Sequence, residues 1–277
     1  MRNIIKNNFR LPLALLALSF WCCYAAAVPA QQVPDNLQMV QDIRLRGQLR
    51  VAAMAVPVYP FTLQKDGVWS GYDVDLATRI ANAIGVKLNW DASYRSNAEL
   101  IAALKQNKAD IAFSRLKRDL QSARQIHYTK PYISLNYVLL TNRMRIMAQR
   151  PGDESIQALS KLPLQIGTID QSAYLSMAKQ RFPAGRISAF ADIASLRAAL
   201  EAGRIDAAFC DEVEAKYLFI EHAELGIRFG YIALPELTSG IVAMVDWPQQ
   251  HWLAWLNLLL EPSSGNTTVN QLFLHHY

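Results

Sequence analysis

The feature that most constrains the fold is an internal repeat. Residues Leu100 to Ser114 recur as Leu196 to Cys210, a separation of 96 residues. Both copies read Leu-x-Ala-Ala-Leu, then five residues, then Asp-x-Ala-Phe. Each copy predicts an amphipathic helix, a short polar turn and a buried strand, which together form the second half of a βαβ unit. Helix–turn–strand units do recur by chance in α/β proteins, but the identical spacing favours a true repeat.

The residues that follow the two predicted strands differ in the sign of their charge. Three cations follow the first strand, Arg115, Lys117 and Arg118, and three acids follow the second, Asp211, Glu212 and Glu214. Open parallel sheets bind ligands just beyond the carboxyl ends of their strands. Two lobes that face each other would therefore present a cationic rim and an anionic rim to one cleft. Such a cleft suits a small zwitterionic or polar solute.

The elements before each repeat complete a βαβαβ order. In the first unit we expect a strand over Leu49–Ala55, a helix from Asp73 to Gly85, a strand over Val86–Trp90 and a helix opened by the capping-box pattern Ser96-x-x-Glu99. In the second unit we expect strands over Leu164–Ile169, Arg186–Phe190 and Ile205–Cys210, with helices over Ser172–Phe182 and Ile193–Ala202. This order predicts an α/β protein with two lobes, each a mostly parallel sheet with flanking helices.

Two further apolar segments indicate how the lobes are connected. Tyr137–Thr141 lies between the units and Gly240–Val245 follows the second unit, and both favour strands. A chain that crosses twice between lobes has a two-strand hinge and ends on the first lobe. We therefore expect residues 31–136 in the first lobe, 137–241 in the second, and 242–277 in the first again. The last segment includes a helix near Gln249–Leu260.

The N-terminal segment has the layout of a secretory signal peptide. Arg2, Lys6 and Arg10 precede an uncharged apolar run from Leu11 to Ala27, with small residues after it. The run is shorter than the about 20 apolar residues that a membrane-spanning helix needs. We expect residues 1–30 to be a signal peptide and the mature protein to be periplasmic. A retained membrane anchor is the alternative.

Composition argues against several function classes. The formal charge is +5, and the predicted signal peptide supplies three positive charges, which leaves 5 − 3 = +2. There is no dense stripe of Lys and Arg with interleaved aromatics, so we expect no nucleic-acid partner. The histidines lack metal-ligand spacing, and no Gly-rich phosphate loop is present, so we expect no metal, no cofactor and no enzymatic activity. Cys210 would remain as a lone thiol in what we expect to be a monomer.

Three motifs carry a resemblance to a known family. They are Gly71-Tyr72-Asp73-Val74-Asp75-Leu76-Ala77, Tyr128-Thr129-x-Pro131-Tyr132, and the segment from Gly203 to Val213. From about Gly47 onward the chain resembles the family 3 bacterial extracellular solute-binding proteins, the periplasmic receptors of polar amino acid ABC importers. The resemblance implies a type II periplasmic-binding-protein fold, capture of a small amino acid-like solute between the lobes, and an inner-membrane ABC permease as partner.

The chain departs from the family pattern at the position that binds the ligand carboxylate. The family uses an Arg five residues after a Ser or Thr, and the corresponding residues here are Ser122 and Lys117. Ser cannot form the planar bidentate pair that Arg forms with a carboxylate. Either Arg115, Lys117 or Arg118 takes over the anion, or the ligand lacks an α-carboxylate. The family's ammonium-binding Asp corresponds to Asp211.

The candidate ligand-binding residues all lie near predicted strand or helix ends. Tyr59 and Phe61 could stack on a ligand or form a local hydrophobic cluster. Asp211 could bind a cation or serve as a helix N-cap. Ser172 would begin a helix, where backbone N–H groups favour anions. The full set is Tyr59, Phe61, Asn97, Ser114, Arg115, Lys117, Arg118, Gln171, Ser172 and Asp211.

Two alternatives to a transport receptor stay open. Cyclohexadienyl dehydratases are similar to this family, and Asp211 or Glu212 could supply the general acid that such an enzyme needs. A sensory or accessory module could instead bind a ligand or partner protein without feeding a transporter. The absence of the usual Arg favours this second alternative.

Overall fold

The computed structural model describes residues 35–149, 155–170, 172–264 and 268–276. All of them belong to one compact unit, Pro34–Tyr277. The predicted signal peptide, residues 1–30, lies outside the described residues. Among the helices that are described, none has both the length and the apolar character of a membrane span.

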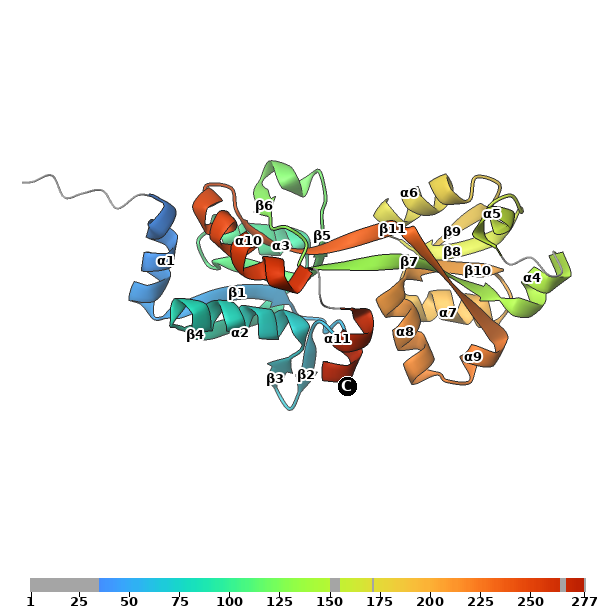
Figure 1. Ribbon diagram of the computed structural model, residues 1–277, viewed down its shortest axis with the longest axis horizontal. Helices are drawn as coiled ribbons and strands as arrows, with labels where there is room; N and C mark the ends of the chain where they lie inside the picture. Colours follow the sequence, from blue (N-terminus) through green and yellow to red (C-terminus); the bar gives the residue numbers. More distant parts are fainter. Residues whose placement is uncertain (1–34, 150–154, 171, 265–267, 277) are drawn as a thin grey trace, which may run out of the picture. The chain divides into compact units, whose positions relative to one another are not determined.

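The centre of the unit is one continuous sheet in the order β4-β1-β5-β11-β7-β10-β8-β9, with β6 also paired to β11 (Figure 1). Its strands are β1 (Gln48–Met54), β4 (Lys87–Tyr94), β5 (Ile111–Lys117), β6 (Ile126–Tyr128), β7 (Ile133–Asn142), β8 (Gln165–Ile169), β9 (Arg186–Phe190), β10 (Ala207–Asp211) and β11 (Phe229–Asp246). A separate hairpin pairs β2 (Leu63–Lys65) with β3 (Val68–Ser70). The hairpin was not predicted.

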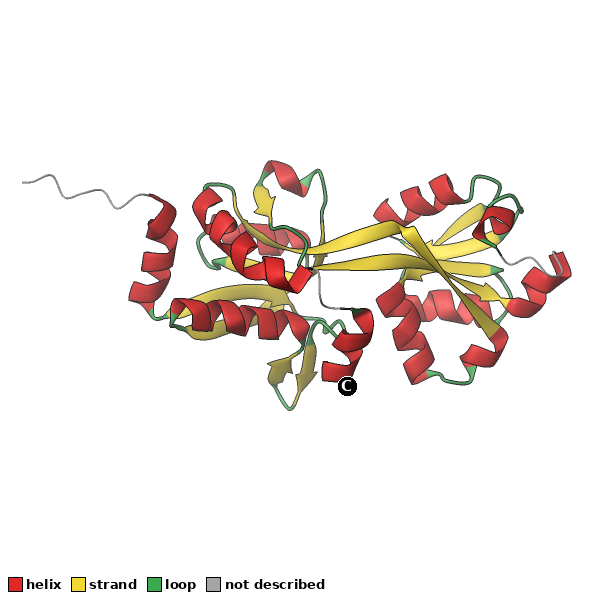
Figure 2. Ribbon diagram, in the orientation of Figure 1, coloured by secondary structure: helices red, strands yellow, loops and turns green. Residues whose placement is uncertain are grey.

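Each end of the sheet is a parallel three-stranded group, which defines a lobe. In the first lobe β1 pairs in parallel with β4 and β5, and in the second β8 pairs in parallel with β9 and β10. The helices lie on the faces of these groups (Figure 2). The first lobe has α1 (Asp35–Arg46), α2 (Tyr72–Ile84), α3 (Asn97–Lys105), η1 (Ser122–Arg124) and α10 (Gln250–Ser264). The second has α4 (Arg143–Gln149), α5 (Ile156–Leu159), α6 (Ser172–Arg181), α7 (Ile193–Glu201), α8 (Glu212–Glu221) and α9 (Leu225–Arg228). The predicted two-lobed α/β fold is confirmed.

Strands β7 and β11 connect the lobes. They pair antiparallel from Ile133 opposite Ile241 to Asn142 opposite Phe229. Each is longer than predicted because the two strands pair with each other along both lobes. In addition, β11 pairs with β5 of the first lobe and β7 pairs with β10 of the second. The predicted lobe boundaries at 136/137 and 241/242 fall within these two strands, and they stay a prediction.

The sequence repeat corresponds to a structural repeat. Asn107 and Gly203 are equivalent and both adopt left-handed backbone, with φ of 54° and 66°. Asp110 accepts the backbone N–H of Arg50 at 2.8 Å, and its equivalent Asp206 accepts that of Gln165 at 2.8 Å. In both lobes the repeat Asp thus ties the start of the last parallel strand to the start of the first.

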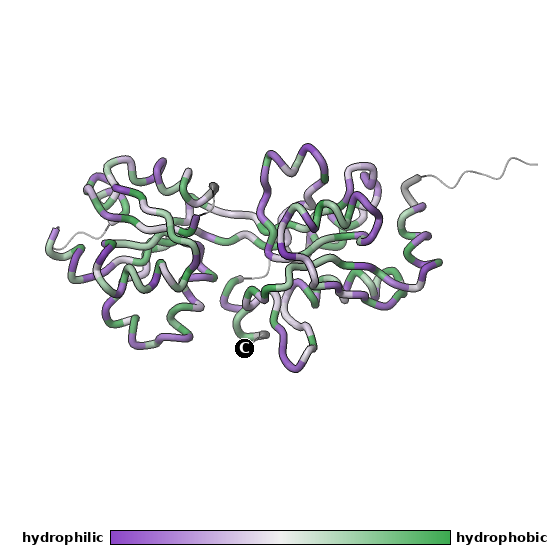
Figure 3. The backbone as a smooth tube through the Cα atoms, turned by 180° about the vertical axis from the view of Figure 1, so that it is seen from behind, coloured by the Kyte–Doolittle hydropathy of each residue, from purple (hydrophilic) through white to green (hydrophobic). Residues whose placement is uncertain are grey.

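Each lobe has its own hydrophobic core, and Val213 of α8 also joins the core of the first lobe. In the first lobe, α2 packs Leu76 and Ile80 onto Val51 and Ile111 of the sheet. In the second lobe, Phe209 and Tyr137 belong to a core that packs on the three parallel strands β8, β9 and β10. Figure 3 shows the hydrophobic residues concentrated in the strands and the hydrophilic ones in the turns.

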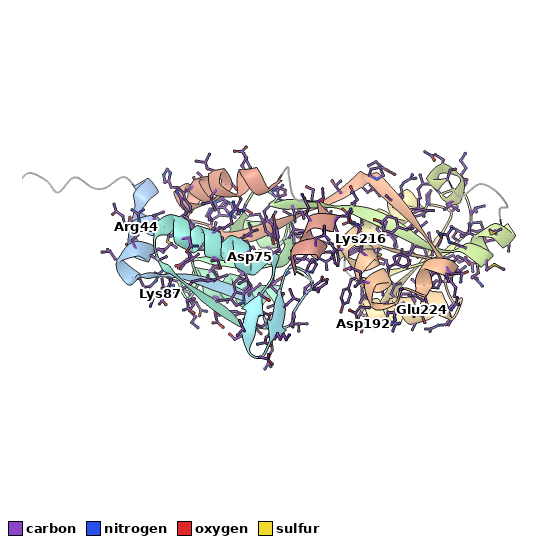
Figure 4. The ribbon with its side chains drawn as sticks, turned by 60° about the horizontal axis from the view of Figure 1, so that its bottom comes forward. Arg44, Asp75, Lys87, Asp192, Lys216 and Glu224 are labelled. Carbon is purple, nitrogen blue, oxygen red and sulfur yellow. The ribbon has the colours of Figure 1, made fainter. Side chains whose placement is uncertain are left out.

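The last helix, α11 (Val269–His276), contacts both lobes. Its Phe273 lies edge-on to Tyr59 of the first lobe, with ring centroids 5.2 Å apart. Its Asn270 accepts a hydrogen bond from Lys216 of α8, which Figure 4 labels beside this helix. The tail from Asn257 to Tyr277 resembles the closing helices of the family described above, and α11 lies within it. Its contact with the second lobe adds to the expectation that residues 242–277 return to the first.

Candidate functional site

A pocket of about 930 Å³ opens at the carboxyl ends of β1 and β5. Met54 and Ala55 line it from the end of β1, and Ser114, Arg115 and Lys117 line it from β5. Tyr174 of α6 lines it from the second lobe. The pocket is therefore at the place where a parallel sheet presents the ends of its strands to a ligand.

Arg115 extends from the first lobe into the acidic end of the second. Its guanidinium donates to Asp211 and, at 3.1 Å, to Glu214 of α8. It also lies 5.9 Å from the centre of the Phe61 ring. Burial lowers the pKa of Arg115, but the charges of Asp211 and Glu214 raise it well above its usual value. Arg115 is therefore cationic in this site.

The backbone of Arg115 is held by Asp73, in the first turn of α2. The Arg115 N–H donates to one carboxylate oxygen of Asp73 at 2.9 Å, and the Tyr132 hydroxyl donates to the other at 2.7 Å. Arg115 has a φ of 48°, which is uncommon for a residue with a side chain. Burial raises the pKa of Asp73 to about 7, although both hydrogen bonds oppose the shift. This carboxylate positions the main chain that bears Arg115.

Asp211 has two functions that the sequence left as alternatives. One carboxylate oxygen accepts from the backbone N–H groups of Val213 and Glu214 at 3.2 and 3.1 Å and so caps α8. The other accepts from Arg115, from Lys117 at 3.3 Å and from the Tyr174 hydroxyl at 2.8 Å. Burial raises the pKa of Asp211, but the two cations outweigh it and lower the pKa to about 2.

Lys117 and Glu214 complete the charged cluster. Lys117 donates to the Tyr174 hydroxyl at 2.6 Å, and burial lowers the pKa of its ammonium group. Burial and the charge of Asp211 raise the pKa of Glu214. We call Arg115, Lys117, Asp211 and Glu214, together with Tyr174, the interlobe cluster.

Three other predicted residues line the pocket without joining this cluster. Ser114 accepts the backbone N–H of Met54 at 2.7 Å. Arg118 is exposed and donates to the carbonyl of Thr129 at 3.0 Å. Asn97 is exposed at the start of α3.

The remaining predicted residues lie elsewhere or are not fully described. Phe61 is fully buried beneath Arg115, and Tyr59 packs against Phe273 and, at 5.3 Å between ring centroids, against Tyr217. The structure therefore brings neither aromatic side chain into the pocket. Ser172 begins α6, and Gln171 lies outside the described residues.

The sequence reasoning did not select Tyr174, Glu214 or Asp73 as site residues. Glu214 follows Asp211 by three residues, so its place on the same helix face was a usable signal. Tyr174 gave no such signal, because a Tyr within a predicted helix is most simply read as core. Ser122, at the family's Arg position, hydrogen-bonds to Asp119 at 2.7 Å and does not line the pocket. Within the described residues, no three His, Cys, Asp or Glu side chains are grouped to hold a metal.

Comparison with known proteins gives relatives of two kinds. The chain is 24% identical over 232 residues to the membrane-bound lytic murein transglycosylase F of Sodalis glossinidius, covering 83% of this chain and 47% of the relative. It is also 24% identical over 179 residues to a probable amino-acid ABC transporter-binding protein of Haemophilus influenzae, and this match covers 62% of this chain and 63% of the relative. The chain thus spans about half the length of the transglycosylases that it matches.

Solved structures show the same fold. A putative binding component of an ABC transporter from Wolinella succinogenes, complexed with lysine, has a TM-score of 0.65 at 23% identity. The match covers 84% of this chain and 96% of that one. The sequence profile of the bacterial extracellular solute-binding proteins, family 3, matches residues 49–214, which is more than half of the chain. The protein therefore belongs to the bacterial extracellular solute-binding proteins, family 3.

Proposed function

We propose that this protein binds one small polar solute in the pocket between its lobes and delivers it to an ABC importer. The observation that carries the proposal is a pocket of about 930 Å³ that Arg115, Lys117 and Tyr174 of the interlobe cluster line. Residues of both lobes meet there, so a bound solute would contact both. A solute stabilises a joined arrangement only by its greater affinity for that arrangement.

Export to the periplasm is part of the same proposal. It is supported by the membership of an extracellular family and by the N-terminal sequence pattern. The Haemophilus influenzae relative supports the choice of an importer as partner. We propose a binding protein and not an enzyme, and the ion pairs that the buried acids of the cluster form with Arg115 and Lys117 support this choice.

A ligand-sensing module is the second candidate. It is supported by the transglycosylase relatives, in which a segment like this chain makes up about half of a longer protein. In such a setting the same pocket would report on a solute without passing it to a permease. The pocket chemistry is the same in both candidates, and only the partner differs.

A thermal-shift screen of amino acids, amines, carboxylates and sugars tests solute binding. A solute that binds only the folded state raises the melting temperature in a saturable way. We expect at least one class to do so, and we expect Lys117→Ala to weaken the effect. If no compound shifts the native protein, the proposal is wrong. Uptake of the identified solute by cells that lack the gene then separates importer from sensor.

A further inference from the structure

The two acids of the interlobe cluster lie behind the residues that line the pocket, and a side chain of the protein itself already occupies them. Asp211 is fully buried, and the side chain of Glu214 is 13% exposed. The Arg115 guanidinium is bound to both carboxylates and is itself 13% exposed. A ligand ammonium or guanidinium would have to displace this group to reach either acid.

The charges of the interlobe cluster balance without a ligand. Arg115 and Lys117 supply two positive charges, and Asp211 and Glu214 supply two negative ones. Separating a buried ion pair leaves an uncompensated buried charge, which is strongly unfavourable. A cationic ligand would impose this cost, since it would free Arg115 from its partners.

The other charged side chains that line the pocket are mostly cationic. They are Arg95, Arg118 and Asp119. Asp119 accepts hydrogen bonds from the backbone and hydroxyl of Ser122, at 2.8 and 2.7 Å. Among the described residues, neither Arg95 nor Arg118 forms an ion pair. The accessible part of the pocket therefore has a surplus of positive charge.

One donor of Arg115 is also unused. Its Nε is buried and has no hydrogen-bond partner among the described residues. Buried donors are nearly always paired, and an unpaired one costs free energy. An anion at the β5 end of the pocket would accept from this group once the atoms that now cover it move aside, and the bonds to Asp211 and Glu214 would stay intact.

We propose that Arg115 acts as a tethered cation that fills the acidic subsite, and that the ligand is a small organic carboxylate without an ammonium group. The inference rests on the proposed function and narrows its ligand class. The ligand carboxylate would bind near Arg115 Nε, Arg118 and Arg95. Amino acids would bind more weakly than their des-amino counterparts, because their ammonium group finds no free acid.

Chemical rescue tests the tethered cation without knowledge of the ligand. Arg115→Ala leaves Asp211 and Glu214 facing an empty space that fits a guanidinium. Millimolar methylguanidinium, compared with equal sodium chloride, should raise the melting temperature of this variant and leave the native protein unchanged. Arg115→Gln should respond in the same way if the alanine variant does not fold. Arg118→Ala is the control and should show no rescue. An equal shift in the native protein and in Arg115→Ala overturns the inference.

Matched probes test the ligand class on the native protein. Carboxylates, the corresponding α-amino acids and the corresponding amines, for example glutarate, L-glutamate and 1,5-diaminopentane, are compared by thermal shift. Within each set, the carboxylate without an ammonium group should raise the melting temperature more than the corresponding amino acid or amine does. If an amino acid or amine gives the larger shift, solute binding stands and this inference fails. If nothing shifts, the proposed function fails and the rescue experiment alone decides the role of Arg115.

Discussion

Arg115 and Asp211 each directly follow one of the two sequence repeats, 96 residues apart, and form an ion pair between the lobes. The repeat places both at the carboxyl end of a parallel strand, β5 in one lobe and β10 in the other. The strand ends face each other, so a cation and an acid at equivalent positions become direct partners.

Substitutions of Asp211 should separate its two functions. Asp211→Asn keeps an oxygen that can cap α8 but removes the charge that pairs with Arg115 and Lys117. Loss of one partner of a buried pair costs about 3–5 kcal/mol. Asp211→Ala also removes the cap and should cost about 1 kcal/mol more. Urea denaturation of both variants measures the difference. Equal stabilities would show that the cap contributes nothing.

Acid should lower the free energy of unfolding through protonation of Asp211. The pKa of Asp211 is lowered from 3.8 to about 2 in the folded state, so the folded state holds this proton less tightly than the unfolded chain. The ionised Asp211 carboxylate therefore contributes its full stabilisation above about pH 4, and this contribution is lost as the pH falls toward about 2. Asp211→Asn should lose less stability over that interval. Equilibrium unfolding at several pH values compares the two proteins, and parallel curves would contradict the assignment.

Asp73 should produce the opposite pH dependence. Its pKa is raised from 3.8 to about 7 in the folded state, so the folded protein binds this proton more tightly. The free energy of unfolding should therefore fall as the pH rises from about 4 to about 7, by a few kcal/mol at about 1.4 kcal/mol per pKa unit. Asp73→Asn cannot titrate and should lack this decline. The test is chemical denaturation across that pH range, and a decline of the same size in both proteins would rule out Asp73 as its source.

Gly71 should tolerate no side chain. It has a φ of 113°, and an added Cβ would lie 2.5 Å from the carbonyl oxygen of Phe61. That approach is fixed because Asp73 donates its backbone N–H to the same oxygen at 2.9 Å. Gly71→Ala should therefore cost at least about 2 kcal/mol. Gly85→Ala is a matched control, since Gly85 has a φ of 85° with nothing within 4 Å, and should cost about 1 kcal/mol. Melting temperatures in the reverse order would contradict the steric explanation.

The two repeat aspartates should differ in their contribution to stability. Asp110 is fully buried and pairs with Arg46 at 2.5 Å and Arg50 at 2.7 Å. Asp206 pairs with Arg145, whose side chain is 43% exposed, at 2.6 Å. Asp110→Asn leaves two cations without an anionic partner, and we expect it to cost about 2–4 kcal/mol, against about 1–2 for Asp206→Asn. Denaturation of each variant measures both values, and a larger loss for Asp206→Asn would be contrary to this ranking.

The sequence predicted the secondary structure best where periodicity was strong. The βαβαβ order appeared in both lobes, and Arg186–Phe190 was predicted with its observed bounds. Ser96 caps α3 as expected, but Glu99 accepts from the backbone N–H of Arg95 and so does not complete a capping box. The β2–β3 hairpin was missed because each of its strands has only three residues. The α11 helix was expected only from the family resemblance of the tail, and contacts with distant residues such as Tyr59 stabilise it.

The sequence by itself determined the two-lobed α/β architecture and the opposite charges at the two strand ends, because repeats and periodicity are local properties of the chain. Only the tertiary structure decided how those charges pair. Asp73 of α2 holds the backbone of Arg115, and Tyr174 of α6 donates to the carboxylate of Asp211. The two helices belong to different lobes. Such contacts depend on how helices pack on the sheet. Burial also decides which of these acids keeps its charge, and burial exists only in the folded protein.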